Sequence, residues 1–355
     1  MKLPSILFLI QFISFLPSFG QQSSITDARL LVSEFVIENN IPGLSITITK
    51  DDSIVWSEGF GYTDVELREP VDPAASKFRI GSVSKTFTAA ALGVLMDEDK
   101  IDLDQPIQTY VPSFPEKQWD ISLRQLAGHL AGIRHYRGDE FLSTKFYPSV
   151  AEGLEIFEKD KLLHEPGTKY SYSSYGWNLI SVAIENITDE PFLAYMHQQV
   201  FEPLDMKNTV PDINSQIIFE RTAFYVHSDD GTIRNAPYVD NSYKWAGGGF
   251  LSTTEDLAKF GNAFLDTEYL TVETIEEMQA PQQTSDGETT DYGLGWRTYH
   301  WNDQEWLGHS GGSVGGTTIF ILSEEEDMVV AMVANLSGVN YDNLHFKIAD
   351  LFTLN

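Results

Sequence analysis

A stretch of apolar side chains at helical spacing in the first third of the chain constrains the fold most. The residues that recur at the three- and four-residue intervals of an α-helix are Phe87, Ala90, Ala91, Val94 and Leu95. Ala89, Leu92 and Met96 make the other faces of this helix apolar as well. Because a helix that is apolar on most sides has to be covered by other elements, we expect it to be buried.

A serine and a lysine stand one turn apart at the start of this helix. If the helix begins at about Ser82, the hydroxyl lies at its amino end and Lys85 follows on the same face. A serine hydroxyl is a poor nucleophile unless a base takes its proton, and a lysine is such a base only where burial or nearby cations destabilise its ammonium. The pattern therefore predicts a nucleophile and its base, although Ser-x-x-Lys also occurs in capped surface helices.

Length, composition and charge limit the classes of function. The chain has 355 residues, of which 42% are apolar and 12% aromatic, enough for a sizeable core in one large domain or two. The formal net charge of −29 would repel nucleic acid and anionic lipid, so we expect neither as a partner. The sequence contains no cysteine, which excludes a disulfide, a thiolate zinc site and a cysteine nucleophile.

The first 20 residues have the features of a secretory signal peptide. Lys2 precedes an apolar run, and the small residues Ser18 and Gly20 follow it. Because proline and glutamine interrupt the run and no charged stop follows, we expect residues 1–20 to be removed and no stable membrane span to remain. The mature domain, residues 21–355, would then be secreted or periplasmic.

Strand patterns occur towards both ends of the mature chain. After an amphipathic helix at 25–39, apolar and polar residues alternate over 44–49, and a second strand follows a turn, which indicates a hairpin. Strands return at 317–322 and 328–334, joined by an acidic turn, and a helix at about 341–352 closes the chain.

Helical patterns separated by proline and glycine dominate the middle of the chain. We therefore expect an α/β fold of the α+β type. Its antiparallel sheet would be built from about 21–100 and 290–355 and flanked by helices, with a mainly helical region, about 101–289, inserted between them. Within that region, residues 245–252 indicate a tight turn before a helix capped by Thr253.

Two further motifs follow the serine–lysine pair. A loop that contains the Pro-Gly-Thr of residues 166–168 leads through Tyr172 into a predicted helix. His309, Ser310, Gly311 and Gly312 come before a predicted strand, and the glycines would let a backbone approach a ligand closely.

In this chain order the motifs resemble those of the serine β-lactamase and penicillin-binding-protein superfamily, in the branch of class C β-lactamases, D-alanyl-D-alanine carboxypeptidases and related esterases. The resemblance covers nearly the whole mature chain and implies the β-lactamase/transpeptidase-like fold. Residues 128–136 (Gly-His-Leu-Ala-Gly-Ile-Arg-His-Tyr), with 172–174 and 309–312, look closest to the mitochondrial β-lactamase-like serine proteases and their bacterial relatives.

The resemblance implies a role for each matched position. Ser82 would be the acylated nucleophile, Lys85 its proton acceptor, and Tyr172 the phenolate or hydrogen-bond partner that passes the proton to the leaving group. The backbone N–H groups of Ser82 and Gly312 would form the oxyanion hole. The positions that would bind the substrate are Ser174, His309, Ser310 and Gly311.

The chain departs from the class C pattern at two positions. Ser174 replaces an asparagine whose amide would hold the substrate, and His309, only partly charged at neutral pH, replaces a lysine. Both changes lower the expected efficiency of β-lactam hydrolysis. Tyr172 and His309 also have structural alternatives, a packing tyrosine and a loop histidine.

Two other catalytic patterns match loosely. Residues 311–315 fit Gly-x-Ser-x-Gly around Ser313, the nucleophile elbow of α/β-hydrolases, but a strand is predicted where that elbow requires a helix. His129 and His135 lack the glutamate of a His-Glu-x-x-His zinc site, so we expect them to order a loop near the site.

We therefore predict an exported serine hydrolase that cleaves an amide or ester through an acyl-enzyme, most closely of the peptidase type. One alternative is an esterase or D-Ala-D-Ala carboxypeptidase with the same residues. Another is a non-catalytic binding or filament-forming module on the same fold. The expected partner is a small-molecule or peptide acyl substrate, with a homo-oligomer possible, and neither a metal nor an organic cofactor is implied.

Overall fold

The structure is a computed structural model that describes residues 19–353. The predicted signal peptide falls outside this range except for its last two residues, which open the first helix, α1 (Phe19–Glu38). Signal removal therefore stays a prediction. The helix expected at 25–39 is confirmed and begins several residues earlier.

The helices and strands follow one another in mixed order. The α-helices after α1 are α2 (Ser84–Asp97), α3 (Leu123–Ala127), α4 (Val150–Gly153), α5 (Ser174–Thr188), α6 (Phe192–Met196), α7 (Trp245–Gly248), α8 (Thr254–Asn262), α9 (Val272–Gln279) and α10 (Leu344–Thr353). The strands are β1 (Gly43–Lys50), β2 (Ser53–Asp64), β3 (Glu69–Pro70), β4 (Phe78–Arg79), β5 (Val210–Pro211), β6 (Tyr225–His227), β7 (Ile233–Asn235), β8 (Phe250–Ser252), β9 (Arg297–Trp301), β10 (Gln304–Ser313), β11 (Gly316–Ser323) and β12 (Met328–Ala334).

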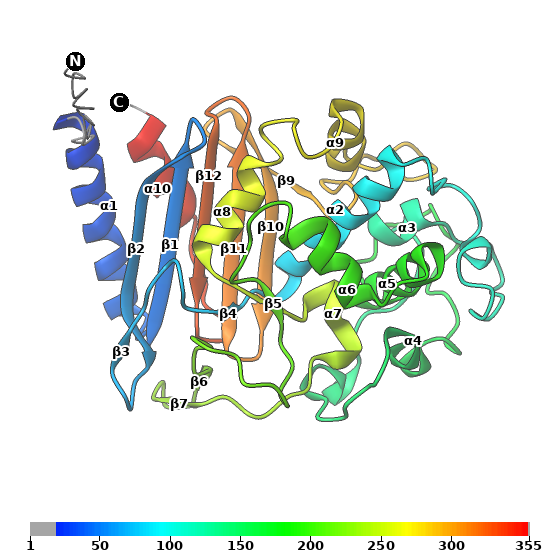
Figure 1. Ribbon diagram of the computed structural model, residues 1–355, viewed down its shortest axis with the longest axis horizontal. Helices are drawn as coiled ribbons and strands as arrows, with labels where there is room; N and C mark the ends of the chain where they lie inside the picture. Colours follow the sequence, from blue (N-terminus) through cyan, green and yellow to red (C-terminus); the bar gives the residue numbers. More distant parts are fainter. Residues whose placement is uncertain (1–18, 354–355) are drawn as a thin grey trace, which may run out of the picture.

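One antiparallel sheet joins the two ends of the chain. Its seven strands lie in the order β3-β2-β1-β12-β11-β10-β9. β1 meets β12 near the middle of this order, where Leu44 pairs with Ala334 and Lys50 with Met328. Figure 1 shows these first and last strands side by side, with most of the helices to one side of the sheet. The expected sheet built from both termini is confirmed.

Both faces of the central strands are buried. Leu44 and the isoleucines that alternate with it lie in the core under α1 and α10. The polar residues between them face α8, where the hydroxyls of Ser45 and Thr47 hydrogen-bond Thr254 at 2.7 and 2.9 Å. The alternating pattern thus marks an apolar face and a hydrogen-bonded polar face, and neither is open to solvent.

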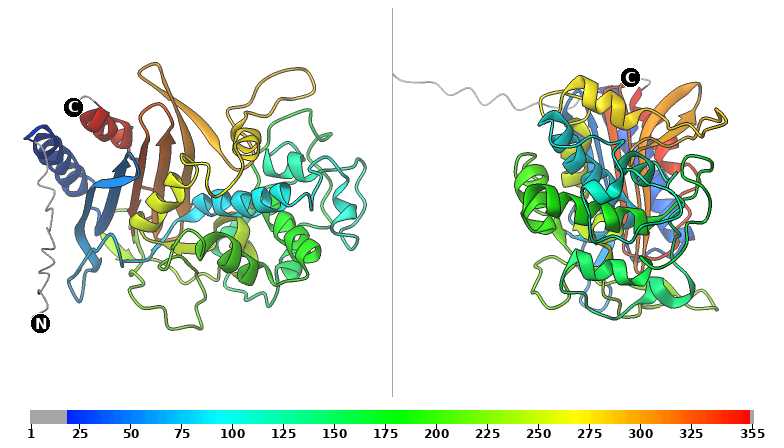
Figure 2. Two further views of the ribbon diagram at one scale, coloured as in Figure 1. Left: turned by 45° about the horizontal axis from the view of Figure 1, so that its top comes forward. Right: turned by 90° about the vertical axis from the view of Figure 1, so that its right-hand side faces the viewer.

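Helix α2 lies inside the molecule, as its apolar surface predicts. Residues 84–93 are all buried. The Phe87 ring lies 4.7 Å from the ring of Phe260 on α8 and 5.5 Å from that of Phe201, measured between centroids. Figure 2 shows α2 in cyan, running from the sheet into the helical half of the molecule. A 3₁₀ turn, η1 (Gly81–Val83), precedes α2, so Ser82 stands in that turn.

The middle of the chain is mainly helical but also contains short strands. β8 lies between β4 and β5 in a small three-stranded sheet. Residues 245–252, predicted as a tight turn, form α7 and β8. Glycine at position 247 allows α7 to pack closely on α5, because a Cβ there would lie only 3.0 Å from the carbonyl oxygen of Ser174. The predicted cap of α8 is confirmed, since Thr253 accepts a hydrogen bond from the Asp256 N–H.

The second half of β10 is open on one side. Pairing with β9 ends at Gly308, so residues 309–313 continue beyond β9 while still pairing with β11. The turn η1 packs against this exposed edge. Gly81 has a φ of +53°, and a Cβ on it would lie 2.6 Å from the carbonyl oxygen of Gly312. The close approach of two backbones brings Ser82 next to the edge of the sheet.

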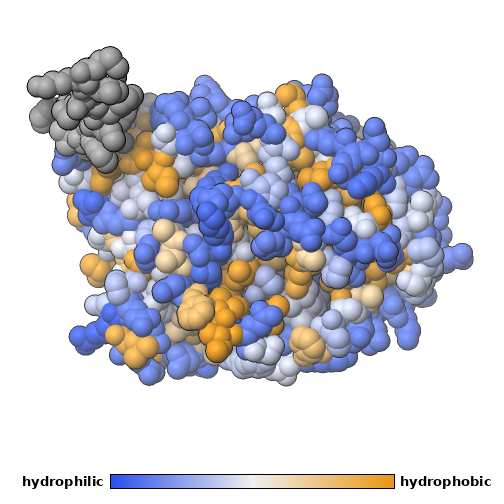
Figure 3. Space-filling model, in the orientation of Figure 1, coloured by the Kyte–Doolittle hydropathy of each residue, from blue (hydrophilic) through white to orange (hydrophobic). Residues whose placement is uncertain are grey.

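The molecular surface agrees with the acidic composition. The face in Figure 3 is predominantly hydrophilic, with apolar side chains in small groups. Among the helices described in residues 19–353, none has the length and hydropathy needed to cross a bilayer.

We expect Gly311→Ala to destabilise the protein. A Cβ at this position would lie 1.9 Å from the carbonyl oxygen of Ile80, a backbone atom that can yield only if η1 moves away from β10. Overpacking of this kind costs about 1–3 kcal/mol, to be measured as a lower midpoint of thermal or urea unfolding.

The neighbouring Gly312→Ala variant is the control, because a Cβ on Gly312 has no atom within 4 Å. Its unfolding midpoint should match the parent. Equal midpoints for the two variants would show that the close packing of β10 on η1 does not restrict position 311.

Candidate active site

Ser82 opens into a cavity of about 280 Å³ between η1, the edge of β10 and the helical half of the molecule. The residues that line it are Ser82, His135, Tyr136, Phe141, Ser174, Lys244, Gly247, Gly248 and Gly312. They come from widely separated parts of the chain. Three of them, Ser82, Ser174 and Gly312, belong to the residues predicted from the sequence.

Lys85 lies beneath this cavity, fully buried, and makes three polar contacts. Its Nζ is 2.9 Å from Ser82 Oγ, 3.1 Å from Ser174 Oγ and 2.5 Å from the carbonyl oxygen of Gly247. Burial, together with the nearby Lys244 cation, lowers the pKa of Lys85 well below its ordinary value. The structure therefore favours the neutral amine.

A neutral amine can satisfy all three contacts. It has two N–H donors and one lone pair, and a carbonyl oxygen can only accept, so one N–H points to Gly247. The oxygen of the Ser174 hydroxyl can accept as well as donate. Ser174 Oγ can therefore accept the second N–H of Lys85, and the lone pair is left for the Ser82 hydroxyl.

Tyr172 also lies close to Lys85, in the loop before α5. Lys85 Nζ is 5.0 Å from the centre of its ring. Burial raises the pKa of the Tyr172 phenol above its ordinary value, and a side-chain hydrogen bond with Ser82 acts in the opposite direction. The burial effect is the larger one, so of the two predicted forms the environment favours the phenol over the phenolate.

Two histidines hold the loop that carries Tyr172. His129 Nδ1 accepts the backbone N–H of Ser173 at 3.1 Å, and His135 Nδ1 accepts that of Ser174 at the same distance. Burial lowers the pKa of His129 well below its ordinary value and that of His135 to about 4, so both are neutral at pH 7. The expectation that they order a loop beside the site is confirmed.

Ser174 is the first residue of α5. Ser173 caps this helix by accepting the N–H of Gly176 at 3.2 Å. The cap fixes the start of α5 and thereby places the next side chain, that of Ser174, against Lys85. Ser174 lines the cavity, and its predicted contact with substrate stays a prediction. Its contact with the lysine was not anticipated from the sequence.

His309 is 2% exposed and engaged at both ring nitrogens. Its Nδ1 lies 2.5 Å from the Ser310 carbonyl oxygen, which requires a proton on Nδ1, so Nε2 accepts the Tyr292 hydroxyl at 2.8 Å. Burial, with the Lys85 charge, lowers the pKa of His309 to about 3. The position that resembles a family lysine therefore offers a neutral ring, and its role in substrate binding stays a prediction.

The glycines of this motif act through their backbone. Gly312 lines the cavity with Ser82. Gly311 packs against the backbone of η1, where a Cβ would meet Ile80 and Ser82, and Ser310 is exposed on β10. The predicted oxyanion-hole residues Ser82 and Gly312 thus share one cavity. The predicted substrate contacts of Ser310 and Gly311 stay predictions.

Sequence reasoning missed the contribution of residues 244–248. Gly247 supplies the carbonyl that holds Lys85, and Lys244 adds a second buried lysine to the cavity. A charged residue between Tyr243 and Trp245, followed by three glycines, was the available signal. The turn predicted at 245–252 leaves out Lys244, because spacing alone does not tell which side chain faces a site.

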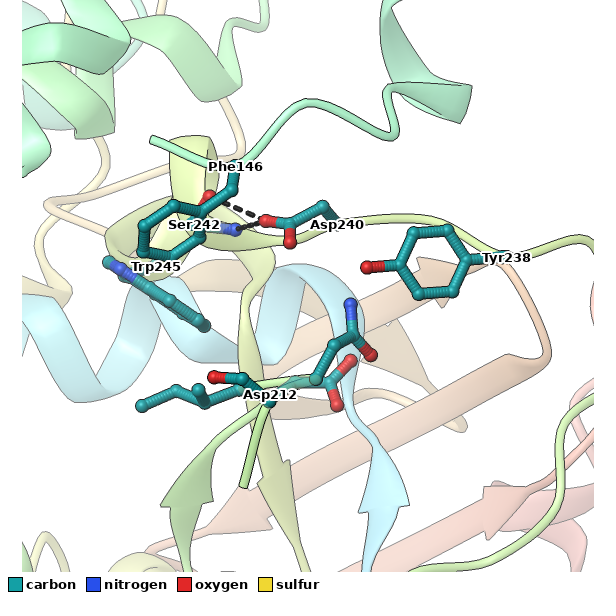
Figure 4. Close-up of a pocket in the computed structure, with 9 residues that line it drawn as sticks. Phe146, Asp212, Tyr238, Asp240, Ser242 and Trp245 are labelled. Atoms are coloured by element: carbon teal, nitrogen blue, oxygen red, sulfur yellow. Dashed lines mark hydrogen bonds between the residues drawn. The ribbon is translucent and has the colours of Figure 1, made fainter. Parts of the chain in front are cut away.

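A second cavity, of about 360 Å³, lies on the other side of this segment. Figure 4 shows Asp212, Tyr238 and Asp240 around it. Both carboxylates are already paired. Asp240 accepts the N–H and hydroxyl of Ser242, and Asp212 binds Arg79 Nε at 2.7 Å and also Arg221. Neither the Ser82–Lys85 pair nor Tyr172 lines this cavity.

Comparison with known proteins agrees with the fold. A family model described as Beta-lactamase matches residues 28–351. Serine beta-lactamase-like protein LACTB, mitochondrial, of Homo sapiens is 31% identical over 435 aligned residues, which cover 92% of this chain and 79% of that protein.

Two solved structures extend the comparison. The octameric penicillin-binding protein homologue from Pyrococcus abyssi is 26% identical, with a TM-score of 0.79 over 92% of this chain and 77% of that chain. The D-stereospecific amidohydrolase from Streptomyces sp. is 22% identical, with a TM-score of 0.75 over 92% and 97%, and shows the same fold. The chain belongs to the beta-lactamase family, within the superfamily of serine β-lactamases and penicillin-binding-protein-like proteins that its motifs predicted.

Proposed function

We propose that this protein is a serine hydrolase that cleaves an amide or ester bond through an acyl-enzyme on Ser82. The observation that carries the proposal is the set of contacts around Lys85. Its two N–H groups have acceptors in Gly247 and Ser174, and Ser82 Oγ lies 2.9 Å from Lys85 Nζ, whose lone pair is left for the Ser82 hydroxyl. A neutral amine in this position is a general base for the serine.

In the acylation step, Lys85 accepts the Ser82 proton while Ser82 Oγ forms a bond to the substrate carbonyl carbon. The bond to the leaving group then breaks, and the leaving group takes a proton that passes from Lys85 through the Tyr172 phenol. Water hydrolyses the resulting ester and restores the Ser82 hydroxyl. The raised pKa of Tyr172 supports a relay through the phenol, in which the proton it gives up is replaced by that of Lys85.

The oxyanion of the tetrahedral intermediate requires donors that are in place before the reaction. We assign this role to the backbone N–H groups of Ser82 and Gly312. The support is the packing of η1 on the open edge of β10, which places both residues around one cavity. Because these donors belong to the backbone, side-chain differences among relatives leave them unchanged.

The bond cleaved is expected to be of the peptidase type, an amide on an acyl group. The name of the Streptomyces structural neighbour, a D-stereospecific amidohydrolase, agrees with amide cleavage on this fold. An esterase or D-Ala-D-Ala carboxypeptidase would use the same residues. Because the His309 ring is neutral, it offers no charge to the carboxylate that a β-lactam presents at that position, which argues against efficient β-lactam hydrolysis.

Export and self-association are separate parts of the proposal. The amino-terminal pattern supports secretion to the periplasm or the medium. The octameric state named for the Pyrococcus homologue supports a homo-oligomer. A binding or filament-forming module without turnover is the alternative to a hydrolase, and covalent labelling separates the two.

A neutral fluorophosphonate probe should label the purified protein on Ser82, and Ser82→Ala should abolish both labelling and hydrolysis. The measurement is intact-protein mass spectrometry, with p-nitrophenyl esters and D-Ala-D-Ala peptides as substrates. Ser313→Ala is the matched control, because Ser313 lies in the Gly-x-Ser-x-Gly pattern and its buried hydroxyl has no hydrogen-bond partner among the described residues. Loss of labelling in Ser313→Ala alone would favour the nucleophile elbow, and an unlabelled parent would favour the binding module.

Lys85→Met should slow acylation by about 10²–10⁴-fold, the usual contribution of a general base. Methionine fills the buried volume without a charge, so the far-UV circular dichroism spectrum and cooperative unfolding should be retained. Stopped-flow or timed labelling by the same probe gives the rate. A variant that acylates as fast as the parent would remove Lys85 from the proposed mechanism.

The rate of labelling should reach its plateau at a pH well below 10.5, the ordinary pKa of lysine, because burial and Lys244 lower the pKa of Lys85. Below that pKa the ammonium predominates, and the rate should fall by about tenfold per pH unit. Lys244→Met removes the neighbouring cation and should move the acid limb to higher pH. A rate that keeps rising to the ordinary lysine pKa would contradict a neutral base at neutral pH.

A further inference from the structure

Lys244 is a buried lysine without a counter-ion. It ends the 3₁₀ turn η6 (Ser242–Lys244), directly before α7, and is 2% exposed. Within residues 19–353 its ammonium has neither an ion pair nor a hydrogen bond. A chain with a net charge of −29 has carboxylates in excess, so a buried lysine that pairs with none of them requires an explanation.

Aromatic rings surround the ammonium instead. Lys244 Nζ lies 4.2 Å from the ring centre of Phe141, 5.3 Å from that of Tyr243 and 5.7 Å from that of Tyr136. Ring faces carry partial negative charge and stabilise a cation, but they are poor acceptors for the three N–H donors of an ammonium. The ammonium is therefore held in place with its hydrogen-bonding capacity unused.

This ammonium belongs to the cavity of the nucleophile. Lys244, Tyr136 and Phe141 line the same 280 Å³ cavity as Ser82. Asp212 is the carboxylate that acts to raise the pKa of Lys244. Arg79 and Arg221 already bind it, and it lies at the second cavity (Figure 4). An anion that neutralises Lys244 therefore has to come from what occupies the Ser82 cavity.

We propose that Lys244, with Tyr136 and Phe141, forms a subsite that binds a carboxylate on the acyl part of the substrate. The proposal rests on the acyl-enzyme chemistry proposed for Ser82. Tyr172, which serves the leaving group in that mechanism, does not line this cavity, so a group bound beside Lys244 belongs to the acyl side. The preferred substrates are amides or esters of acyl groups that carry a negative charge, such as those of acidic amino acids.

The state of His309 supports this assignment. At the position that resembles a family lysine, this chain places a neutral ring bonded to Tyr292. A cation that faces the Ser82 cavity comes instead from a different segment, the turn before α7. The cavity thus has its cation at Lys244, whereas His309 does not line it.

The preference for an anion should itself depend on pH. Burial, with repulsion from Arg79, lowers the pKa of Lys244 to about 7, whereas Asp212 acts to raise it. Lys244 is charged below that pH and neutral above it, while a substrate carboxylate stays ionised. The titratable or charged groups packed around Lys244 are Arg79 from β4, Lys85 from α2, His135, Tyr136 and Glu140 from the segment after α3, Asp212 from the segment after β5, and Tyr243 from η6.

The test compares substrates that differ only in charge, the α-p-nitrophenyl esters of N-acetyl-glutamate and N-acetyl-glutamine and the corresponding aspartate and asparagine pair. For the parent protein, kcat/KM should favour the acid over the amide by about tenfold or more in at least one pair, the range expected of a charge-assisted contact. The preference should decline as the pH rises through about 7. A parent ratio near one in both pairs overturns the proposal without any variant.

Lys244→Met should reduce the acid-to-amide ratio to about one, since methionine keeps the packing against the rings but carries no charge. Lys145→Met is the control, because Lys145 is exposed, stacks on Tyr147 and does not line the cavity. An unchanged ratio in Lys244→Met would overturn the subsite. The effect of Lys244 on the pKa of Lys85 in the substrate-free protein is common to both substrates, so it cancels in the ratio.

Fluorophosphonate labelling separates failure of this subsite from failure of the proposed function. The probe has no carboxylate, so it reports only on Ser82 and its base. A parent that is labelled but shows no charge preference contradicts the subsite alone. A parent that is not labelled and turns over neither ester contradicts the acyl-enzyme itself, and with it the subsite.

Discussion

The buried amine of Lys85 is the interaction on which the site depends. Desolvating an ammonium is costly unless a carboxylate compensates, and among the described residues no carboxylate pairs with this one. The amine instead meets a carbonyl and two hydroxyls, from Gly247, Ser174 and Ser82. These groups satisfy the neutral form, so the same packing that stabilises the fold prepares a base.

The three partners of the amine come from three elements, and small residues let those elements approach. Gly247 allows α7 to pack on the start of α5, and Gly81 and Gly311 allow η1 to pack on the edge of β10. Any side chain at these positions would meet backbone atoms, which cannot move aside independently. The absence of a side chain at these glycines thus lets Ser82, Lys85 and the sheet edge lie close together, and Gly247 also supplies its carbonyl to Lys85.

Charge in the site is arranged differently from what the motifs alone indicate. His309 stands at the position that resembles a family lysine but is buried and neutral beside Tyr292. Lys244, which matches no predicted motif, is a cation without a partner among residues 19–353 and shares the cavity of Ser82. The two lysines also act on each other, because the charge of Lys244 helps to lower the pKa of Lys85. A substrate charge bound at Lys244 would therefore be felt at the base.

The sequence by itself determined the local features. Helical spacing predicted the buried α2, strand alternation predicted the β1–β2 hairpin, and the Ser-x-x-Lys spacing predicted that Ser82 and Lys85 face each other, because a helical turn brings residues three apart together. The order of the three motifs along the chain, at Ser82–Lys85, Tyr172 and 309–312, also indicated the family.

Only the tertiary structure decided the rest. The contacts of Lys85 with Ser174 and with Gly247 span 89 and 162 residues of sequence. The surroundings of Lys244 depend on the rings of Tyr136 and Phe141, from a distant segment of the chain. Such distances follow from how complete elements pack, which no local pattern specifies.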